Sequence, residues 1–257
     1  MDFFAYKNNK LYCEDVDLQD IAMECGTPCY VYSKKTLERH VEVYKNAFKT
    51  KNNLICFSVK SLSNISILEL INKNGCGFDV VSGGELKRAL YIGADPKKII
   101  FSGVGKSYDE ILLGIQEGIL SFNVESESEL YRIEKIAGDI ESPAPISIRI
   151  NPDIDSGGHD YITTGRKGDK FGISDTRKVI DLCKHAHQSK NLKVVTDSSH
   201  LFAKQSFNQW SLIYLVEQKY KDILKIIHDL ICIFRYSIKN EIAGQNSHFV
   251  QNLRCKV

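Results

Sequence analysis

The stretch that decides the fold is Leu-Ile-Cys-Phe-Ser-Val-Lys at residues 54–60, an almost wholly apolar run that ends in one lysine. A run of this length and content is typical of a strand buried on both faces of a parallel sheet. In barrels of such strands the catalytic groups lie at the carboxyl ends, where Lys60 falls. Desolvation there would favour the neutral amine, which can form a Schiff base with an aldehyde cofactor. The alternative is a lysine that merely marks the end of a strand and points to solvent.

Similar apolar runs recur and alternate with amphipathic helical patterns. We expect strands at 54–60, 77–82, 99–103, 120–126, 145–150 and 192–196. The helices expected between them cover 65–73, 84–92, 108–117, 127–137 and 175–189. A strand and a helix that repeat every ~22 residues predict βα units on a parallel sheet, and a run of similar units favours a (β/α)8 barrel over a doubly wound sheet. Six units are visible where such a barrel needs eight.

The chain on either side of these units has a different character. Before them we expect a strand pair over 3–12 that turns at Asn8-Asn9, a helix over 18–25 between Asp17 and Gly26, a short strand over 29–32 after Pro28, and a helix capped by Ser33 that runs to Phe48. After about residue 195 the turn residues disappear, since 16 of the 17 glycines and all five prolines lie at or before Gly172. Apolar residues between Leu212 and Ile231 keep helical spacing. We therefore expect a strand and helix segment over 1–53, a barrel domain over 54–196 and a divergent helical tail over 197–257.

Composition and charge are those of an ordinary globular protein. The 257 residues, 43% hydrophobic and 26% charged, can bury a large core. A net charge of +2 gives no broad field for nucleic acid or an anionic membrane, and no apolar run approaches the ~20 residues of a membrane span. The eight cysteines form neither a Cys-x-x-Cys pair nor a zinc spacing, which predicts reduced thiols, no metal site and a cytoplasmic location.

Several short motifs follow one another in order over three quarters of the chain. They are 14–16 (EDV) with 26–33 (GTPCYVYS), 57–60 (FSVK), 77–86 (GFDVVSGGEL), 149–153 (RINPD), and 158–165 (GHDYITTG) followed by 170–173 (KFGI). Together they resemble the N-terminal part of the diaminopimelate decarboxylases, pyridoxal 5'-phosphate (PLP) enzymes of the alanine racemase-like barrel class. Ornithine and arginine decarboxylases share the lysine strand and the Gly-Phe-Asp-like segment, whereas 26–33 and 158–165 favour the diaminopimelate enzymes.

The resemblance implies roles for four residues. Lys60 would hold PLP as a Schiff base that the substrate amine displaces. Asp79 would orient Lys60 or the cofactor ring, unless it is a buried carboxylate bonded to backbone. Arg149 would steady the phenolic oxygen of the cofactor, unless it forms a buried structural ion pair. His200 falls near the position of a histidine that stacks on the ring, in a context that differs from that of the family.

Three further features have a structural and a functional interpretation each. The stretch Ser82-Gly83-Gly84-Glu85 could cradle a phosphate at a helix start, but related enzymes use a later glycine-rich loop, so helix packing is favoured. His159 lies in the long 151–170 connection and is more simply an exposed loop residue than part of a substrate entrance. Lys170 suits a salt-bridge network near the cofactor and a solvated loop charge equally.

By this resemblance the chain is a PLP-dependent carboxy-lyase that converts meso-2,6-diaminopimelate to L-lysine and CO2 in lysine biosynthesis. Its partners would be a small diamino acid and, as in the family, a second copy in a homodimer. The family's glycine-rich phosphate loop and C-terminal β domain have no counterpart after residue 196, so we expect an incomplete barrel. A frame change or truncation near residue 195 would explain this, and an intact reading frame with a continuous family match would contradict it. The alternatives are a non-catalytic PLP-binding barrel for cofactor homeostasis and an inactive partner of a full-length decarboxylase.

Overall fold

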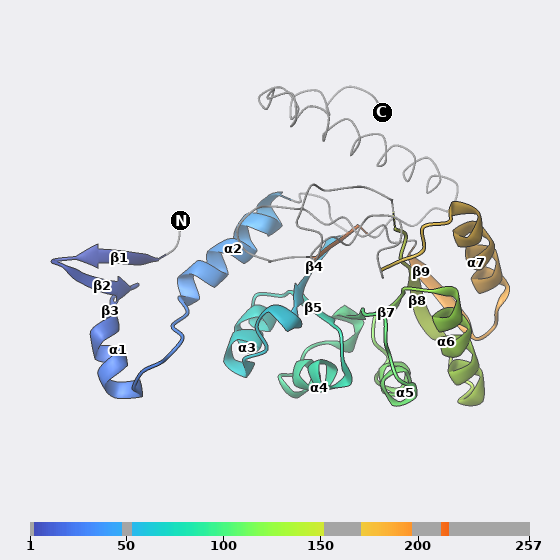
Figure 1. The fold of residues 1–257 in the computed structure, drawn as a ribbon, viewed down its shortest axis with the longest axis horizontal. Helices are drawn as coiled ribbons and strands as arrows, with labels where there is room; N and C mark the ends of the chain where they lie inside the picture. Colours follow the sequence, from blue (N-terminus) through green and yellow to red (C-terminus); the bar gives the residue numbers. More distant parts are fainter. Residues whose placement is uncertain (1–2, 48–52, 152–170, 197–211, 216–257) are drawn as a thin grey trace, which may run out of the picture.

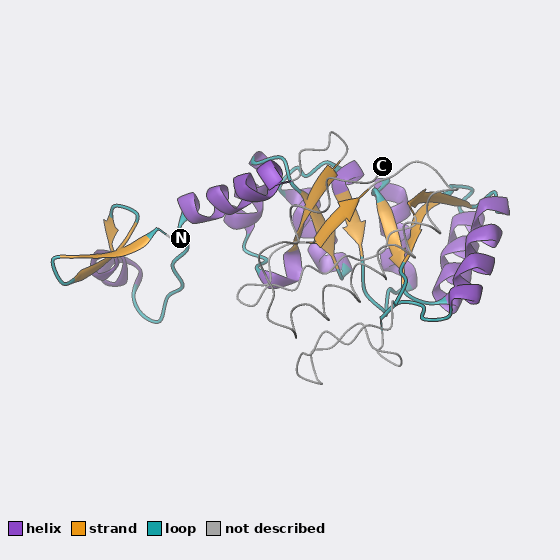
Figure 2. Cartoon of the chain, turned by 90° about the horizontal axis from the view of Figure 1, so that it is seen from above, coloured by secondary structure: helices purple, strands orange, loops and turns teal. Residues whose placement is uncertain are grey.

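The structure, a computed structural model, describes residues 3–47, 53–151, 171–196 and 212–215. A small three-stranded sheet comes first, and a seven-stranded sheet lined with helices follows it (Figure 1). Figure 2 shows from above that the small sheet lies at one end of the molecule and that helix α2 lies between it and the large sheet. The large sheet is the part that was predicted to form the barrel.

The N-terminal unit confirms its predicted strand pair and helix. It contains β1 (Phe4–Lys7), β2 (Lys10–Cys13), β3 (Val16–Asp17) and α1 (Leu18–Cys25). Strands β1 and β2 turn at Asn8 and Asn9, whose φ angles of 50° and 63° lie in the left-handed region that asparagine tolerates. The Asp17 carboxylate accepts the Gln19 N–H at 2.9 Å, so that it caps α1 as expected.

The predicted strand over 29–32 is wrong. These residues form an irregular connection in which Tyr30 is 91% exposed. A strand needs a neighbour for its backbone groups, and none of the described strands pairs with this stretch. Helix α2 (Lys34–Ala47) then begins where predicted, because the Ser33 hydroxyl oxygen accepts the Thr36 N–H at 3.0 Å.

The large sheet confirms the predicted order of βα units. Six strands lie side by side in chain order and pair in parallel. Their bounds are β4 (Asn53–Ser58), β5 (Gly77–Val80), β6 (Ile99–Phe101), β7 (Ser121–Val124), β8 (Ala144–Ile148) and β9 (Leu192–Thr196). Consecutive parallel strands joined by helices are the arrangement of an α/β barrel wall.

One further strand joins this sheet from the tail. Strand β10 (Leu212–Leu215) pairs antiparallel with β4, with Leu212 opposite Cys56. These four residues belong to the stretch whose spacing predicted a helix. Pairing with the edge of β4 satisfies backbone groups that an unpaired edge would leave to solvent, which is a reason for the strand. In the described part of the chain β9 and β10 are the outermost strands, so the sheet is open there.

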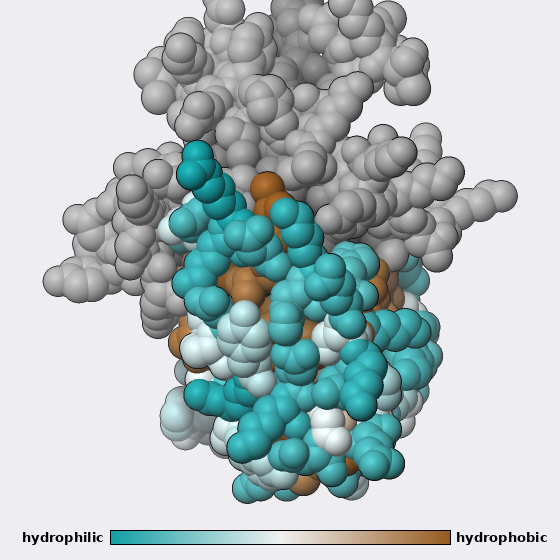
Figure 3. All heavy atoms as spheres, turned by 90° about the vertical axis from the view of Figure 1, so that its right-hand side faces the viewer, coloured by the Kyte–Doolittle hydropathy of each residue, from teal (hydrophilic) through white to brown (hydrophobic). Residues whose placement is uncertain are grey.

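The helices follow the curve of the sheet on its outer side (Figure 1). They are α3 (Ile65–Lys73), α4 (Gly83–Tyr91), α5 (Tyr108–Glu117), α6 (Glu127–Asp139) and α7 (Thr176–Gln188), with short 3-10 turns η1 (Val59–Ser61) and η2 (Pro96–Lys98). The surface on the side of α6 and α7 is mainly hydrophilic, as expected for an outer layer (Figure 3). Within the described ranges no helix is both long enough and apolar enough to cross a bilayer.

The core lies between the sheet and these helices. Phe78, Phe101 and Phe122 come from three neighbouring strands and are fully buried there. The rings of Phe101 and Phe122 stack with centroids 6.0 Å apart. Helix α5 approaches β7 so closely that a Cβ at Gly114 would lie 2.6 Å from Cζ of Phe122. Six cysteines lie in the described ranges and all are free thiols, of which Cys25 and Cys29 are exposed and the others, Cys13, Cys56, Cys76 and Cys183, are buried.

Candidate active site

The inner face of the sheet carries polar side chains beside the apolar Cys56 and Ile100. Successive side chains of a strand point to opposite faces, so Phe78 and Phe122 pack under the helices while their neighbours Asp79 and Asn123 point inward. The parallel strands end at one edge, and polar side chains gather at their carboxyl ends. This is the edge at which barrels of this architecture place their functional groups.

Lys60 lies at the carboxyl end of β4, as predicted, but in the turn η1 that follows the strand. The turn is closed by the Ser61 hydroxyl, which donates to the Ser58 carbonyl at 2.6 Å, and it directs the buried Val59 away from its exposed neighbour Lys60. The desolvation expected of Lys60 is therefore not provided by the described residues. An exposed amine is instead open to a ligand at this edge of the sheet.

Asp79 is 4% exposed on β5 and bonds to side chains rather than to backbone. Its Oδ1 accepts the Ser102 hydroxyl, and its Oδ2 lies 3.4 Å from the Ser58 hydroxyl, which donates to it. Burial raises the pKa of Asp79 to about 6, and the Ser102 hydrogen bond and the positive charges of Lys60 and Arg149 oppose this rise. Lys60 and Arg149 thus act electrostatically on one buried carboxylate.

Arg149 follows β8 and forms the buried ion pair that was the alternative to a cofactor contact. Its Nη1 donates to Glu125 Oε1 at 2.7 Å, and both side chains are almost fully buried. Glu125 also accepts the N–H groups of Gly103 at 3.4 Å and Gly172 at 3.0 Å. The guanidinium lies 4.8 Å from the ring centroid of Phe171. The Glu125 carboxylate therefore joins three chain segments, at Gly103, Arg149 and Gly172. Contact of Arg149 with a cofactor stays a prediction.

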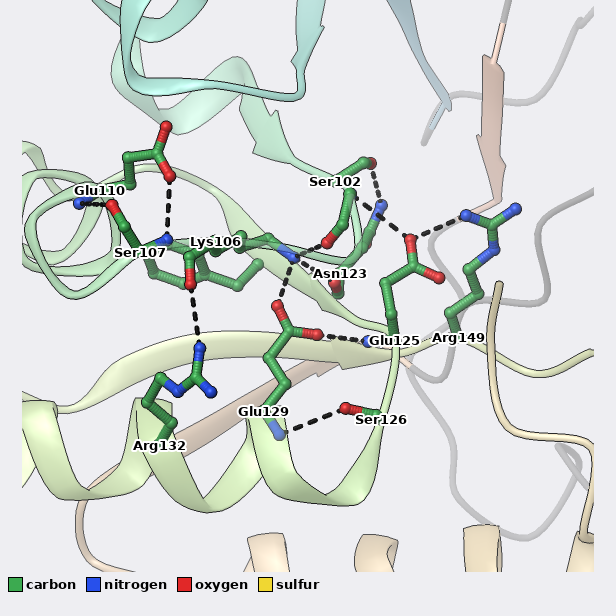
Figure 4. Close-up of polar contacts among 12 residues, drawn as sticks. Ser102, Lys106, Ser107, Glu110, Asn123, Glu125, Ser126, Glu129, Arg132 and Arg149 are labelled. Atoms are coloured by element: carbon green, nitrogen blue, oxygen red, sulfur yellow. Dashed lines mark hydrogen bonds and ion pairs between the residues drawn. The ribbon is translucent and has the colours of Figure 1, made fainter. Parts of the chain in front are cut away.

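A second buried pair, between Lys106 and Glu129, was missed by sequence reasoning (Figure 4). The Lys106 ammonium donates to Glu129 Oε1 at 2.7 Å and to the carbonyls of Gly103 and Asn123 at 2.8 Å each, which uses its three N–H groups. The other Glu129 oxygen accepts the Glu125 N–H at 2.6 Å. The available signal was a lysine in the short Gly-Val-Gly-Lys stretch directly after a buried strand. Two of its three partners, Asn123 and Glu129, lie 17 and 23 residues further on, beyond any local pattern.

The hydrogen bonds of residues 82–85 support the interpretation of this stretch as the start of a helix. The Ser82 hydroxyl oxygen accepts the Glu85 N–H at 3.3 Å, and the Glu85 carboxylate accepts the Val81 N–H at 2.8 Å. The Gly83 N–H donates to Glu110 of the next helix at 2.7 Å. Because side chains of the protein occupy these N–H groups, the start of α4 is not arranged as a phosphate cradle.

The other residues singled out in the sequence, His159, Lys170 and His200, lie outside the described residues. The three that are described, Lys60, Asp79 and Arg149, come together at one edge of the sheet. Sequence reasoning also missed Ser102 and Asn123, which supply hydrogen bonds beside Asp79. Their signal was a polar residue within or directly after a buried strand.

Comparison with known proteins identifies the family. A family model described as "Pyridoxal-dependent decarboxylase, pyridoxal binding domain" matches residues 34–223. The chain belongs to this family. Within these pyridoxal-dependent decarboxylases it is 46% identical over 234 residues to the diaminopimelate decarboxylase of Haemophilus influenzae, which covers 89% of this chain and 56% of that relative. The chain spans about half the length of the curated relatives it matches.

Solved decarboxylase structures have the same fold. The diaminopimelate decarboxylase of M. jannaschii in co-complex with L-lysine superposes with a TM-score of 0.71 at 34% identity, over 77% of this chain and 48% of that one. The diaminopimelate decarboxylase of Helicobacter pylori complexed with L-lysine gives 0.67 at 42% identity, over 71% of this chain and 46% of that one. The predicted α/β barrel class is therefore confirmed for the part of the fold that the chain spans.

The described residues fit PLP, the cofactor of this decarboxylase family, at its aldehyde end. Lys60 offers an exposed primary amine at the carboxyl edge of the sheet, which is the group that an aldehyde requires. Asp79 on β5 and Arg149 after β8 place a buried carboxylate and a buried guanidinium at the same edge of the sheet, and the Arg149 charge acts on the carboxylate. A cofactor with both a protonatable ring and anionic oxygens can use both charges.

Proposed function

We propose that this protein acts in the PLP-dependent decarboxylation of meso-2,6-diaminopimelate to L-lysine and CO2. The observation that carries the proposal is the position of Lys60, an exposed amine directly after β4 and beside the buried Asp79. Support comes from relatives named diaminopimelate decarboxylase, among them one that is 46% identical. The chain spans about half of those relatives, so the activity of this chain is the part to be tested.

The proposed role of Lys60 is to bind PLP covalently through its Nζ. PLP, when bound, supplies an electron sink for the electron pair that remains as CO2 leaves. Lys60 suits the binding role because a flexible side chain on a rigid turn can reach a ligand and withdraw again when the substrate amine takes its place. The turn itself is fixed by the Ser61 hydrogen bond to Ser58.

Asp79 and Arg149 would orient the bound group. Glu125 holds the Arg149 guanidinium in one position, so a contact between this guanidinium and an anionic oxygen would cost little further side-chain freedom. Asp79, with a pKa of about 6, can both hold and release a proton near neutral pH. The positive charge of Lys60 acts on this carboxylate and favours its ionised form.

The experiment is to add PLP to the purified chain, reduce with borohydride and map the modified lysine by mass spectrometry. We expect a stable PLP adduct on Lys60 in the wild type and its loss in Lys60→Ala. Lys73→Ala is the matched control, because Lys73 is a lysine exposed on α3, and it should leave the adduct on Lys60 unchanged. Equal labelling of several surface lysines would argue against a cofactor site.

Release of CO2 from meso-2,6-diaminopimelate tests the catalytic step separately. Release that depends on both PLP and Lys60 would support decarboxylation by this chain. An adduct on Lys60 without CO2 release would favour the alternative of a PLP-binding protein without turnover. If activity appears only after a full-length decarboxylase is added, the partner alternative gains support.

A further inference from the structure

A chain of hydrogen bonds crosses three neighbouring strands on the inner face of the sheet. Asn123 of β7 donates from Nδ2 to the Ser102 hydroxyl oxygen at 2.8 Å, and the Ser102 hydroxyl donates to Asp79 Oδ1. All three side chains are at most 5% exposed. Buried groups of this kind keep the partners that the fold gives them, because solvent is not available as a substitute.

The chemistry of the groups gives this chain one direction. The nitrogen of an amide side chain can only donate, so the Ser102 oxygen must accept from Asn123. A hydroxyl has one hydrogen, and Asp79 Oδ1 is the only acceptor that the described residues offer to the hydrogen of Ser102. A proton on Oδ1 itself would place two hydrogens between the same two oxygens. Oδ1 is therefore an acceptor in either charge state of Asp79.

We propose that Ser102 and Asn123 are positioning residues for Asp79, which hold its Oδ1 as a permanent acceptor and assign any proton of this carboxyl group to Oδ2. Oδ2 is the oxygen on the side of β4, where the strand leads into Lys60. The Ser58 hydroxyl, 3.4 Å from Oδ2, can rotate to accept a proton that Oδ2 carries, because a hydroxyl both donates and accepts. A proton of Asp79 is thereby placed on the side of Lys60 rather than deeper in the sheet. The use of this proton in turnover rests on the proposed function. The direction of the hydrogen bonds from Asn123 through Ser102 to Asp79 does not depend on it.

Other charged and titratable groups also act on Asp79 and must be kept constant in a test. They are Cys56 of β4, Lys60 of η1, Glu85 of α4 and Arg149 after β8. None of them is changed by a substitution at Ser102. A comparison between variants at Ser102 therefore isolates the effect of the hydroxyl donor.

The test is a carbon-13 NMR titration of the Asp79 carboxyl in the full chain without cofactor, with the signal assigned by its loss in Asp79→Asn. Because the Ser102 hydrogen bond stabilises the ionised carboxylate, Ser102→Ala should move the Asp79 midpoint up by about one pH unit. Ser102→Thr keeps the hydroxyl and should return the midpoint towards that of the wild type. Asn123→Leu should raise the midpoint by a smaller amount, because Ser102 remains but loses the donor that polarises it.

Ser121→Ala is the matched control. Ser121 is another buried serine on the inner face, where it pairs with Ser147 at 2.8 Å and has no hydrogen bond to Asp79. Its loss should leave the Asp79 midpoint unchanged. The inference would be overturned if the Asp79 midpoint stays in place or falls in Ser102→Ala. It would also be overturned if the midpoint moves as much in Ser121→Ala as in Ser102→Ala. If the wild type fails to take up PLP, the proposed function fails. The titration still decides whether Ser102 and Asn123 position Asp79.

Discussion

At the scale of single residues, Asp79 is a carboxylate whose burial opposes its charge. Burial raises its pKa from 3.8 to about 6, so the folded state holds a proton that the unfolded state has already released in that range. Asp79 therefore contributes stability at low pH that is lost as the pH rises from about 4 and is gone above about 6. We expect the free energy of unfolding of the wild type, relative to Asp79→Asn, to fall by up to about 3 kcal/mol across this window. Urea unfolding of both proteins at a series of pH values measures it, and parallel curves would contradict it.

Lys106 allows a prediction about the cost of an unpaired buried charge. In Lys106→Met the Glu129 carboxylate loses its cation, and the carbonyls of Gly103 and Asn123 lose a donor. We expect a loss of about 3–5 kcal/mol in the free energy of unfolding at neutral pH. Urea unfolding followed by circular dichroism gives the value.

The control for Lys106 breaks an exposed pair in the same way. Lys73→Met removes the partner of Glu69 on α3, where the two side chains are 76% and 47% exposed, and should cost about 0.5 kcal/mol or less. Similar losses in the two variants would mean that the Lys106 pair is far better solvated than its burial indicates.

Sequence and resemblance reached only some residues of the site. Lys60 and Asp79 were found because each ends or occupies a buried strand within a recognisable motif. Sequence reasoning did not find Lys106, Ser102 and Glu125, because each contacts a partner on another βα unit. The Ser102 hydroxyl bonds a residue 23 positions earlier, and Glu125 bonds one 24 positions later. Only the register of the parallel strands brings such positions together.

At the scale of elements, two helical glycines are expected to respond to the same substitution in opposite ways. A methyl group at Gly114 of α5 would lie 2.6 and 2.9 Å from atoms of the Phe122 ring, whereas one at Gly84 of α4 would have only the Ser82 hydroxyl nearby, at 3.9 Å. Gly114→Ala should lower the free energy of unfolding by about 1–3 kcal/mol through overpacking. Gly84→Ala should raise it by about 0.4–1 kcal/mol, because alanine restricts the unfolded chain more than glycine.

Thermal and urea unfolding of both glycine variants provide the measurement. The pair is its own control, because helix propensity alone predicts stabilisation in both cases. Stabilisation by Gly114→Ala would mean that α5 can move away from β7 at little cost.

The predicted elements were correct where a local pattern decides the structure. Helices α3 and α5 begin and end at the predicted residues. Strand β5 stops two residues earlier than predicted, because Ser82 turns the chain into the cap of α4 and the Val81 N–H bonds to Glu85. The strand predicted over 29–32 has suitable residues but no partner strand, and pairing is a property that the local sequence does not contain.

At the scale of the whole molecule, the connection between the two sheets contains an irregular segment between α1 and α2 (Figure 1). Tyr30 is 91% exposed in an irregular segment, so its backbone can enter a protease cleft. We expect brief chymotrypsin treatment to cut after Tyr30 before any other site within the described ranges. Tyr91 is the internal control, because it is 80% exposed but lies at the end of α4. Mass spectrometry of early fragments identifies the cut, and earlier cleavage after Tyr91 would show that α4 opens first.

The positions of the cysteines would allow opening of the fold to be followed by alkylation. Cys25 and Cys29 lie in solvent, whereas burial raises the pKa of the Cys56 thiol well above its ordinary value and also that of Cys76. Alkylating reagents attack the thiolate, so the exposed pair can react in the native protein while the buried thiols are protected twice, by access and by protonation. Each opening of the large sheet that exposes Cys56 or Cys76 would leave a permanent mass label. The number of labels on a molecule would then count how far it has opened, without an added dye or an engineered site.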